Sequence, residues 1–467
     1  MKKQHIKICI PLILLVLIGC QTHYPQDKSQ KKDITKIEQK AYESTLAYEL
    51  VESLTVEVGP RLAGSDKDLL AVQWAEKTFK ALGFDKVYKE PVQVPVWHRG
   101  TATANVIAPF QQPLVITALG GSIGTPEKGI EANIIRFDNL DALKAASKAQ
   151  VKDKIVFIDH KTRKTRTGAG YGETVSGRSQ GAMIAAEKGA VAILIRSIGT
   201  DSDRMAHTGI MKYHDNIKKI PAAAMSNPDA DLVNAMLKRS PNILINLKMS
   251  SSRQGFTQSY NVIAEVTGHT KPQEIVLISA HLDSWDEGTG ALDDGAGVGI
   301  VTAAAKIIQD LPKRPDRTIR VVLFAAEEIG IIGAKAYLKA HEKELANHYI
   351  AAESDFGAGF IYQLDLNVNQ QAFNELHHTL FPITSHQITL GNNRAHGGPD
   401  ISIFPNKGIP VASLRQNGLD YFDYHHTPND TLDKIDPKKL QQNVAAYALF
   451  AYLMAQSNSE LRPITNK

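Results

Sequence analysis

The fold of this chain is decided by the stretch Glu274-Ile-Val-Leu-Ile-Ser-Ala-His281-Leu-Asp283. Its apolar run predicts a buried strand, because short runs rich in Ile and Val belong to the interior of parallel sheets. The run ends in a histidine and an aspartate, and open α/β sheets bind ligands beyond the carboxyl ends of their strands. Further carboxylates follow in Gly290-Ala-Leu-Asp293-Asp294-Gly and Phe324-Ala-Ala-Glu327-Glu328. We therefore expect a site at this edge of a sheet.

Strands and helices alternate from this stretch to the C-terminus. Apolar runs predict strands at 275–280, 318–325 and 349–353. Apolar residues at helical spacing predict helices at 297–309, at 331–344 and, with a proline in its first turn, at 437–456. Such an alternation is typical of α/β folds with parallel sheets. The predicted fold class is therefore α/β, with a mostly parallel mixed sheet sandwiched by helices.

The middle of the chain, from about residue 114, has a different texture. Short runs typical of strands are separated by glycine-rich turns and by helical segments at 178–188 and 229–239. A chain of 467 residues also exceeds what one hydrophobic core usually holds. We therefore expect a smaller α/β module, 113–252, inserted between two pieces of a larger domain, 41–112 and 253–467.

The N-terminus has the pattern of a bacterial lipoprotein signal. Lysines in the first seven residues precede a short apolar segment, and Leu17-Ile18-Gly19-Cys20 resembles a lipobox. Residues 1–19 are the predicted signal peptide and Cys20 the predicted acylation site; a plain secretory signal or an anchor helix is the alternative. The polar residues 20–40 are predicted to be a tether. These features predict a bacterial envelope protein, held by its N-terminal lipid at the periplasmic side of the outer membrane, or exported.

Composition and charge indicate an ordinary globular protein and argue against a nucleic-acid-binding protein. Apolar residues make up 43% and charged residues 22% of the chain, as in ordinary globular proteins. Lys and Arg exceed Asp and Glu by only four, and the basic residues are scattered apart from 28–40. A nucleic-acid-binding protein would carry a concentrated basic face, so we expect no nucleic-acid partner. Both cysteines, Cys9 and Cys20, lie at the N-terminus, so a metal site elsewhere must use His, Asp and Glu.

Five potential metal ligands lie at strand ends or in loops of the second half of the chain: His281, Asp293, Glu328, Asp355 and His426. Two imidazoles and three carboxylates are more than one tetrahedral ion with an open position requires. They suit two ions that share one bridging carboxylate. His-x-Asp and Glu-Glu pairs also occur singly on surfaces and at helix ends, but their combination favours a dinuclear site.

Neighbours of these ligands are expected to have separate roles. Asp283 alternates with His281 on the strand end and is predicted to orient the imidazole without binding metal. Adjacent side chains at a strand end point in opposite directions, so one of Glu327 and Glu328 can bind metal while the other faces a substrate. Asp294 is predicted to have a structural role.

Five motifs together resemble the co-catalytic zinc aminopeptidase family: Ser279-Ala-His281-Leu-Asp283, Ala291-Leu-Asp293-Asp294-Gly, Ala325-Ala-Glu327-Glu328, Glu353-Ser-Asp355 and His425-His426-Thr427. The resemblance covers nearly all of the chain after the signal, and the middle segment is similar to an inserted protease-associated domain. It implies two Zn²⁺ ions per chain held by the five ligands above, with Asp293 as the bridge and Glu327 as the general base. It also implies His426, rather than its rival His425, as the ligand, and a cis peptide bond between Asp293 and Asp294.

The resemblance further implies an exopeptidase that hydrolyses dipeptides or short peptides, of the carboxypeptidase or dipeptidase type. Glu327 would take a proton from the attacking water and return it to the leaving amine. An aminopeptidase is the alternative, because the ligand set does not say which end of a peptide is recognised. A receptor-like binding protein without activity and a single-zinc acyltransfer enzyme agree less well with the intact ligand set. Relatives in this family are often dimers, so a homodimer is the oligomer to test.

Candidates for substrate contact rest on fewer residues. The loop His396-Gly-Gly398-Pro-Asp400 resembles a glycine-rich loop that faces the metals in relatives. His396 is therefore a candidate to stabilise a developing oxyanion, with Asp400 beside it. Structural roles are the leading interpretation for four other residues that could reach a substrate terminus from the rim or the insert: Tyr421, Tyr424, Arg178 and His207.

Overall fold

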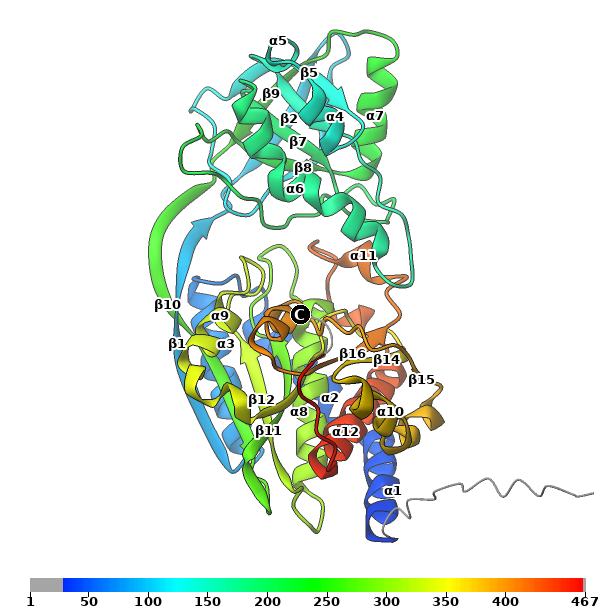
Figure 1. Ribbon diagram of the computed structural model, residues 1–467. Helices are drawn as coiled ribbons and strands as arrows, with labels where there is room; N and C mark the ends of the chain where they lie inside the picture. The colour runs from blue at the N-terminus through cyan, green and yellow to red at the C-terminus, as the bar shows by residue number, and fades with distance from the viewer. Residues whose placement is uncertain (1–27, 465–467) are drawn as a thin grey trace, which may run out of the picture.

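The computed structural model describes residues 28–464 as two connected α/β parts (Figure 1). The predicted signal peptide, Cys20 and the first residues of the predicted tether lie outside these described residues. None of the helices within 28–464 is long and apolar enough to span a lipid bilayer. Two long strands, β1 (Lys86–His98) and β10 (Ser252–Val266), run between the larger part and the smaller one above it in Figure 1.

The larger part is built on an eight-stranded sheet with the order β1-β10-β12-β11-β13-β16-β14-β15. Its other strands are β11 (Lys271–His281), β12 (Arg317–Phe324), β13 (His348–Glu353), β14 (Ile361–Asn367), β15 (Thr389–Leu390) and β16 (Val411–Gln416). The central strands β12, β11, β13 and β16 are parallel to one another, whereas β1, β10 and β14 pair antiparallel. The predicted α/β class is confirmed.

The central strands are apolar because helices cover both faces of the sheet. Every residue of β12 and β13 is buried, as are the residues of β11 from Ile275 onward. Val276 and Ile278 pack into the core on one face, whereas Ile275 and Leu277 pack into the core on the other. Burial on both faces calls for a continuous apolar run in place of strict alternation.

Helices α8 (Ala296–Gln309), α12 (Pro437–Gln456) and α2 (Leu46–Ser53) cover one face of this sheet, and α9 (Ile332–Ala340) covers the other. Helix α12 has the predicted bounds. The Asp436 side chain accepts hydrogen bonds from the amides of Lys438 and Lys439, and Pro437 occupies the first position. Both choices suit a helix start, where free amides need acceptors and proline lacks an amide.

The larger part also contains further helical elements. They are α1 (Lys28–Glu43), α3 (Asp66–Ala81), α10 (Gln370–Thr379), α11 (Tyr421–Tyr424), η1 (Leu54–Val58), η2 (Ala291–Gly295), η3 (Glu342–Asn347), η4 (Phe381–His386), η5 (Asp400–Ile403), η6 (Pro405–Lys407) and η7 (Leu432–Lys434). Of these, η2 and η5 lie next to the candidate site described below.

Residues 28–40, predicted to belong to a tether, instead form helix α1, which packs on α12. Ile34, Ile37 and Ala41 are buried on its inner face. The Tyr452 hydroxyl of α12 donates a hydrogen bond to the Asp33 carboxylate at 2.9 Å. The prediction was wrong because the segment is polar on average, yet apolar residues spaced three and four apart are enough to pack on a neighbouring helix.

The smaller part holds a second eight-stranded sheet with the order β3-β2-β9-β5-β6-β7-β8-β4. Its strands are β2 (Ala102–Ala108), β3 (Gln112–Leu114), β4 (Ile116–Ala118), β5 (Ile130–Phe137), β6 (Ile155–Ile158), β7 (Ala192–Arg196), β8 (Ala222–Met225) and β9 (Leu244–Met249). Its helices are α4 (Leu140–Ala145), α5 (Lys148–Val151), α6 (Ala169–Glu187) and α7 (Asn227–Leu237). We call this part the insert. Its sheet begins at β2, ahead of the expected boundary at residue 113, because β2 pairs with β9.

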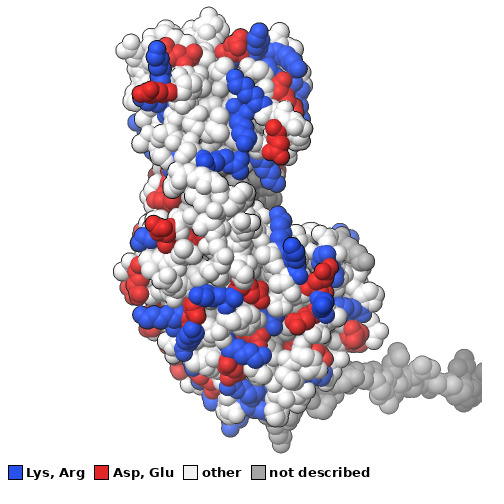
Figure 2. All heavy atoms as spheres, turned by 90° about the vertical axis from the view of Figure 1, so that its left-hand side faces the viewer, with Lys and Arg blue, Asp and Glu red and all other residues white. Residues whose placement is uncertain are grey.

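An antiparallel ribbon connects the two parts. β1 and β10 pair along almost their whole length, from Lys86 opposite Glu265 to His98 opposite Ser252. The molecule narrows between the parts on the face seen in Figure 2, where basic and acidic side chains are interspersed. The insert is therefore joined to the larger part by two adjacent strands that enter and leave at the same place.

Replacing Ile37 with alanine should destabilise the larger part. Ile37 is fully buried, and truncating a buried isoleucine to alanine costs about 2–5 kcal/mol. We expect scanning calorimetry to record a lower melting temperature for Ile37→Ala. Lys32→Ala, at an exposed position of the same helix, should melt like the parent protein. Equal melting temperatures for both variants would mean that α1 does not pack on α12 in solution.

Candidate metal centre

Five acidic and imidazole side chains converge beyond the carboxyl ends of the central strands. His281 ends β11, Glu328 follows β12, Asp355 follows β13, Asp293 lies in η2 before α8, and His426 follows α11. All are buried except Asp355, which is partly exposed. Parallel strands place their carboxyl ends at one edge, so the fold brings together the ligand set predicted from the sequence.

Asp293 lies between the two imidazoles. Its Oδ1 atom is 3.1 Å from His281 Nε2, and its Oδ2 atom is 3.2 Å from His426 Nε2. Asp355 Oδ1 is 3.6 Å from the same nitrogen of His281, and Glu328 Oε2 is 3.0 Å from that of His426. Two groups of one imidazole and one carboxylate therefore share Asp293.

Main-chain hydrogen bonds fix the position of Asp293. The Asp430 carboxylate accepts from the amides of Leu292 and Asp293, at 2.6 and 3.1 Å. The Asp294 carboxylate accepts from the amides of His281 and Gly297, both at 3.1 Å. The peptide bond between Asp293 and Asp294 is cis, as the resemblance implied. Asp294 and Asp430 thus act on the main chain, and their carboxylates are committed to amides.

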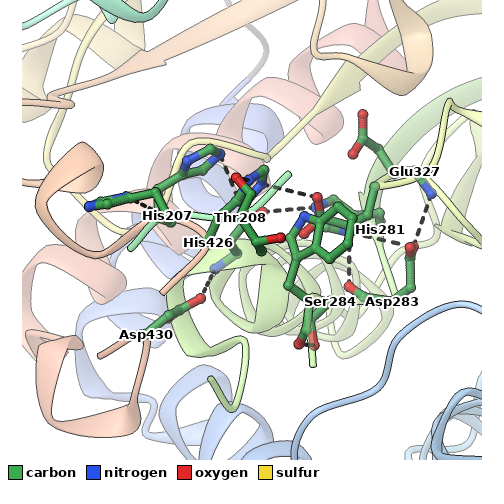
Figure 3. A network of polar contacts seen from close by, with 12 residues as sticks. His207, Thr208, His281, Asp283, Ser284, Glu327, His426 and Asp430 are labelled. Carbon is green, nitrogen blue, oxygen red and sulfur yellow. Dashed lines mark hydrogen bonds and ion pairs between the residues drawn. The ribbon is translucent and has the colours of Figure 1, made fainter. Parts of the chain in front are cut away.

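Both imidazoles are oriented by backbone carbonyls. His281 Nδ1 donates to the carbonyl oxygen of Asp283 at 3.0 Å, and His426 Nδ1 donates to that of Thr208 at 3.3 Å (Figure 3). A carbonyl oxygen only accepts, so each ring carries its proton on Nδ1 in the neutral form. Both Nε2 lone pairs therefore point at the shared carboxylate, which is the tautomer that a metal ligand needs.

Asp283 orients His281 through its main chain, which differs from the predicted role of its carboxylate. Asp283 Oδ1 lies 3.7 Å from His281 Nδ1, beyond hydrogen-bond distance. It accepts a hydrogen bond from the Glu327 amide at 3.0 Å instead. Figure 3 shows the Glu327 carboxylate projecting away from this contact, and Glu327 lines the cavity described below. The Asp283 carboxylate therefore holds the backbone from which Glu327 projects.

The electrostatics of the cluster are dominated by buried acids. Burial, with the charges of Asp355 and Glu328, raises the pKa of Glu327 well above its ordinary value. Burial and the Asp293 charge raise the pKa of Glu328 to about 7, against the opposing effect of His426. Burial alone would lower the pKa of His426, but the nearby carboxylates of Glu328 and Asp293 raise it to about 9. Without a cation, the cluster retains protons.

The residues present fit divalent cations. Asp293 Oδ2 and Glu328 Oε1 are buried and have no hydrogen-bond partner among the described residues. Lone pairs of His281 and His426 face carboxylate oxygens, an arrangement that repels unless a proton or a cation lies between. Nitrogen and oxygen ligand atoms close enough to share an ion occur in His281, Asp293 and Asp355. The same is true of Asp293 with the two histidines 425 and 426.

His425 is a neighbour of this second group, but it approaches fewer acids than His426 does. Its Nε2 atom lies 3.5 Å from Asp293 Oδ2, and its ring stacks on His426 with 3.5 Å between centroids. Glu328 lies within 4.0 Å of His426 and of no other described histidine. The His425 carbonyl accepts a hydrogen bond from His207 Nδ1 at 2.7 Å. His426 therefore has the better position for a ligand, and His425 packs against it.

A cavity of about 600 Å³ opens on the cluster between the insert and the larger part. Its walls include Tyr171, Arg178, Glu327, Asp355, Phe356 and His396. Of the candidates for substrate contact, His396, Tyr421 and Arg178 line the cavity, whereas Asp400, Tyr424 and His207 do not. Asp400 is fully buried, because the loop turns its side chain inward towards Glu353. Tyr424 instead lies under Lys434, whose ammonium group is 5.3 Å from the ring centroid.

Two residues of the insert that sequence reasoning did not single out also belong to the site. Tyr171 lines the cavity, and its ring lies 5.2 Å from that of His425. The carbonyl of Thr208 orients His426, and the Thr208 amide donates to the His426 carbonyl at 3.0 Å. The glycine-rich stretch 168–172 is the one sequence signal near Tyr171, because its Gly168 has a left-handed backbone conformation that favours glycine. Thr208 carries no signal, because it acts through its main chain.

Comparison with known proteins shows that the chain is similar to peptidases in sequence and in structure. The sequence pattern of peptidase family M28 matches residues 261–451. The chain is 37% identical to carboxypeptidase Q of Homo sapiens over 419 residues, which are 89% of this chain and 86% of that protein. It is 63% identical to the solved peptidase M28 precursor of Shewanella amazonensis, with a TM-score of 0.92 over 94% of this chain and 99% of that one.

A more distant structure shares the fold alone. The zinc aminopeptidase BSAP of Bacillus subtilis is 20% identical, with a TM-score of 0.63 over 90% of this chain and 97% of that one. The aligned region includes the insert as well as the larger part. The insert is the whole of the chain between β1 and β10, so the larger part alone is too short to give this coverage.

Divalent metal ions should stabilise the protein by binding to this cluster. A ligand present at about 100 times its Kd raises the free energy of unfolding by about 2.7 kcal/mol. We expect the melting temperature to fall after dialysis against a chelator and to recover when a first-row divalent metal is added. The melting temperature of Asp293→Asn should be the same with and without added metal. If this variant responds like the parent protein, the stabilising ion binds elsewhere.

Proposed function

Because the chain belongs to peptidase family M28 and is a metallopeptidase, we propose that it uses two zinc ions to hydrolyse dipeptides or short peptides from a free end. The observation that carries this proposal is the position of Asp293, whose two oxygens face two separate imidazole–carboxylate pairs at 3.1 and 3.2 Å. A carboxylate placed in this way suits a bridge between two ions.

Each proposed zinc ion has its own ligands on this chain. His281 and Asp355 would hold one ion, His426 and Glu328 would hold the other, and Asp293 would bind both. Imidazole and carboxylate are ordinary zinc ligands, and three protein ligands leave a position open for water or substrate. The zinc aminopeptidase of Bacillus subtilis, which shares the fold, supports the choice of metal.

Glu327 is the proposed general base. Bound zinc lowers the pKa of water and polarises a carbonyl group. Glu327 lines the cavity next to the ligands, and its backbone is held by Asp283. Its raised pKa in the metal-free protein means that its carboxyl group keeps a proton readily. Glu327 would accept the proton of the attacking water and return it to the leaving amine.

The cavity suits a peptide that ends inside it. Glu353 and Asp355 give its metal side an acidic lining, which favours a free amino group and keeps aminopeptidase activity as the second candidate. A dipeptide presents both a free amine and a free carboxylate to one cavity. The likeness to carboxypeptidase Q over most of the chain supports a carboxypeptidase or dipeptidase.

The proposed activity is tested with a panel of dipeptides, unblocked, N-acetylated or amidated at the carboxyl end. We expect hydrolysis of unblocked dipeptides that disappears on chelation and returns with zinc. Hydrolysis that survives complete removal of metal would contradict the proposal, as would a zinc-loaded protein that cleaves no peptide of the panel.

Glu327→Gln should lower kcat by several orders of magnitude and leave zinc bound, because proton transfer is lost while the ligands stay. Zinc content by elemental analysis and kcat on the best-cleaved dipeptide are the measurements. Glu342→Gln removes an exposed carboxylate on η3 and should change neither. Near-normal turnover by Glu327→Gln would mean that another group acts as the base.

His426→Ala and His425→Ala separate the two adjacent histidines. His426 faces both Asp293 and Glu328, so its removal should reduce the zinc content from about two ions to about one per chain. His425→Ala should retain both ions, because His425 approaches Asp293 alone among the acids. Loss of an ion from His425→Ala, with two retained in His426→Ala, would reverse the assignment.

A further inference from the structure

Arg178, on helix α6 of the insert, is a buried cation that has no anionic partner within residues 28–464. It lines the cavity and is only 5% exposed. One of its terminal nitrogens donates to the Tyr171 hydroxyl at 2.6 Å, and the other approaches the Thr208 carbonyl at 3.4 Å. Its Nε atom is buried and has no hydrogen-bond partner among the described residues. No carboxylate of residues 28–464 lies within 4.0 Å of its guanidinium, since it takes part in no ion pair there.

Other buried arginines of this protein are satisfied. Arg196 and Arg320 form ion pairs with buried acids. Arg61, which is fully buried, donates from all three guanidinium nitrogens to the carbonyls of Leu282, Thr289 and Gly290. Taking a charge out of water is costly unless a counter-charge or a full set of acceptors replaces the water. Arg178 has neither among residues 28–464, so its charge is left uncompensated at the cavity wall.

The surroundings of Arg178 preserve this position. A Cβ atom added to Gly209 would lie 2.3 Å from an Arg178 terminal nitrogen, so the guanidinium occupies space that any side chain at residue 209 would take. The Tyr171 ring, which carries the hydroxyl bound to Arg178, lies 5.2 Å from the His425 ring. The His425 ring in turn stacks on the His426 ring. Arg178 is therefore held a short distance from the candidate metal ligands, on the opposite part of the molecule.

We propose that Arg178 binds the free C-terminal carboxylate of the peptide substrate. This inference rests on the function proposed above and specifies which end of the peptide is recognised. The acids on the metal side would be neutralised by zinc, whereas Arg178 remains the buried cation of the cavity. In a dipeptide the carbon of the C-terminal carboxylate lies two bonds from the nitrogen of the bond that is cleaved, about 2.5 Å away. A planar guanidinium suits a carboxylate because it can donate two parallel hydrogen bonds.

Equilibrium binding tests the contact without turnover. In zinc-loaded Glu327→Gln, the best-cleaved dipeptide of the panel is titrated by calorimetry and compared with its C-terminal amide. We expect the free acid to bind more tightly on the order of 10- to 100-fold, as for a hydrogen bond to a charged group. Adding Arg178→Gln should bring the two affinities together. Equal affinities before that substitution, or a preference that persists after it, would overturn the proposal.

Steady-state kinetics give a second measurement, with three substrates: a dipeptide of neutral side chains, its C-terminal amide, and an amide with an acidic side chain. Arg178→Gln should reduce kcat/KM for the free acid on the order of 10- to 100-fold and leave the neutral amide unaffected. Arg178→Lys, which retains the charge without the planar fork, should fall between the two. If only the acidic amide responds, Arg178 recognises a side chain and the proposal is wrong.

Two controls separate failure of this inference from failure of the proposed function. Lys212→Gln removes another cation of the cavity wall, which is exposed, and should keep the preference for the free acid. Zinc content and hydrolysis of the neutral amide report whether Arg178→Gln is folded and active. A wild-type enzyme that cleaves acid and amide equally contradicts the role of Arg178 alone. A zinc-loaded wild-type protein that cleaves no peptide contradicts both proposals.

Discussion

The Asp293 carboxylate is the point on which the rest of the site depends, because each of its oxygens faces a different imidazole. That placement needs three separate supports. The Asp430 carboxylate accepts hydrogen bonds from the amides of Leu292 and Asp293. The Asp294 carboxylate binds the amide of His281 at the end of β11. Backbone carbonyls orient both imidazoles through their Nδ1 atoms. A shift of any support would separate the two halves of the cluster, so the surrounding loops are fixed by main-chain hydrogen bonds.

Charge imposes a second constraint. Strands of a parallel sheet deliver their next residues to one edge, and here those residues include Asp355, Glu327 and Glu328 beside Asp293. So many carboxylates cannot all be ionised in a buried place without cations. The fold therefore creates a strong demand for positive charge on the metal side of the cavity. On the other side lies Arg178, a buried arginine that forms no ion pair within residues 28–464, which gives the cavity two electrostatically different ends.

Much of the larger part could be predicted from sequence because its signals are local. The apolar run of β11, the periodicity of α8 and the proline start of α12 each report burial or capping directly. The five candidate ligands could be predicted as a set, since their residue types and strand-end positions restrict the chemistry. The converging geometry agrees with that set, although the role of each ligand stays a prediction.

The remaining features depend on contacts between distant segments. Helix α1 was read as a tether because its few apolar residues matter only when α12 lies beside them. The Asp283 carboxylate contacts an amide beyond β12 in place of the adjacent imidazole. Thr208 reaches the site from the insert with a main-chain carbonyl, and no residue pattern reports a carbonyl. Asp400 faces inward because its loop folds over Glu353, which its sequence does not reveal.

The ribbon of β1 and β10 has a consequence for the order in which the chain folds. The whole insert lies between the two strands in the sequence, although His98 pairs with Ser252. If the insert were unfolded, pairing of β1 with β10 would have to close a long flexible loop. Loop closure loses more entropy as the loop lengthens, and distant pairings form slowly. A folded insert, with β2 paired to β9, already brings the two strands side by side. We expect the insert to form first and to act as the nucleus from which the ribbon, and then β12, can assemble.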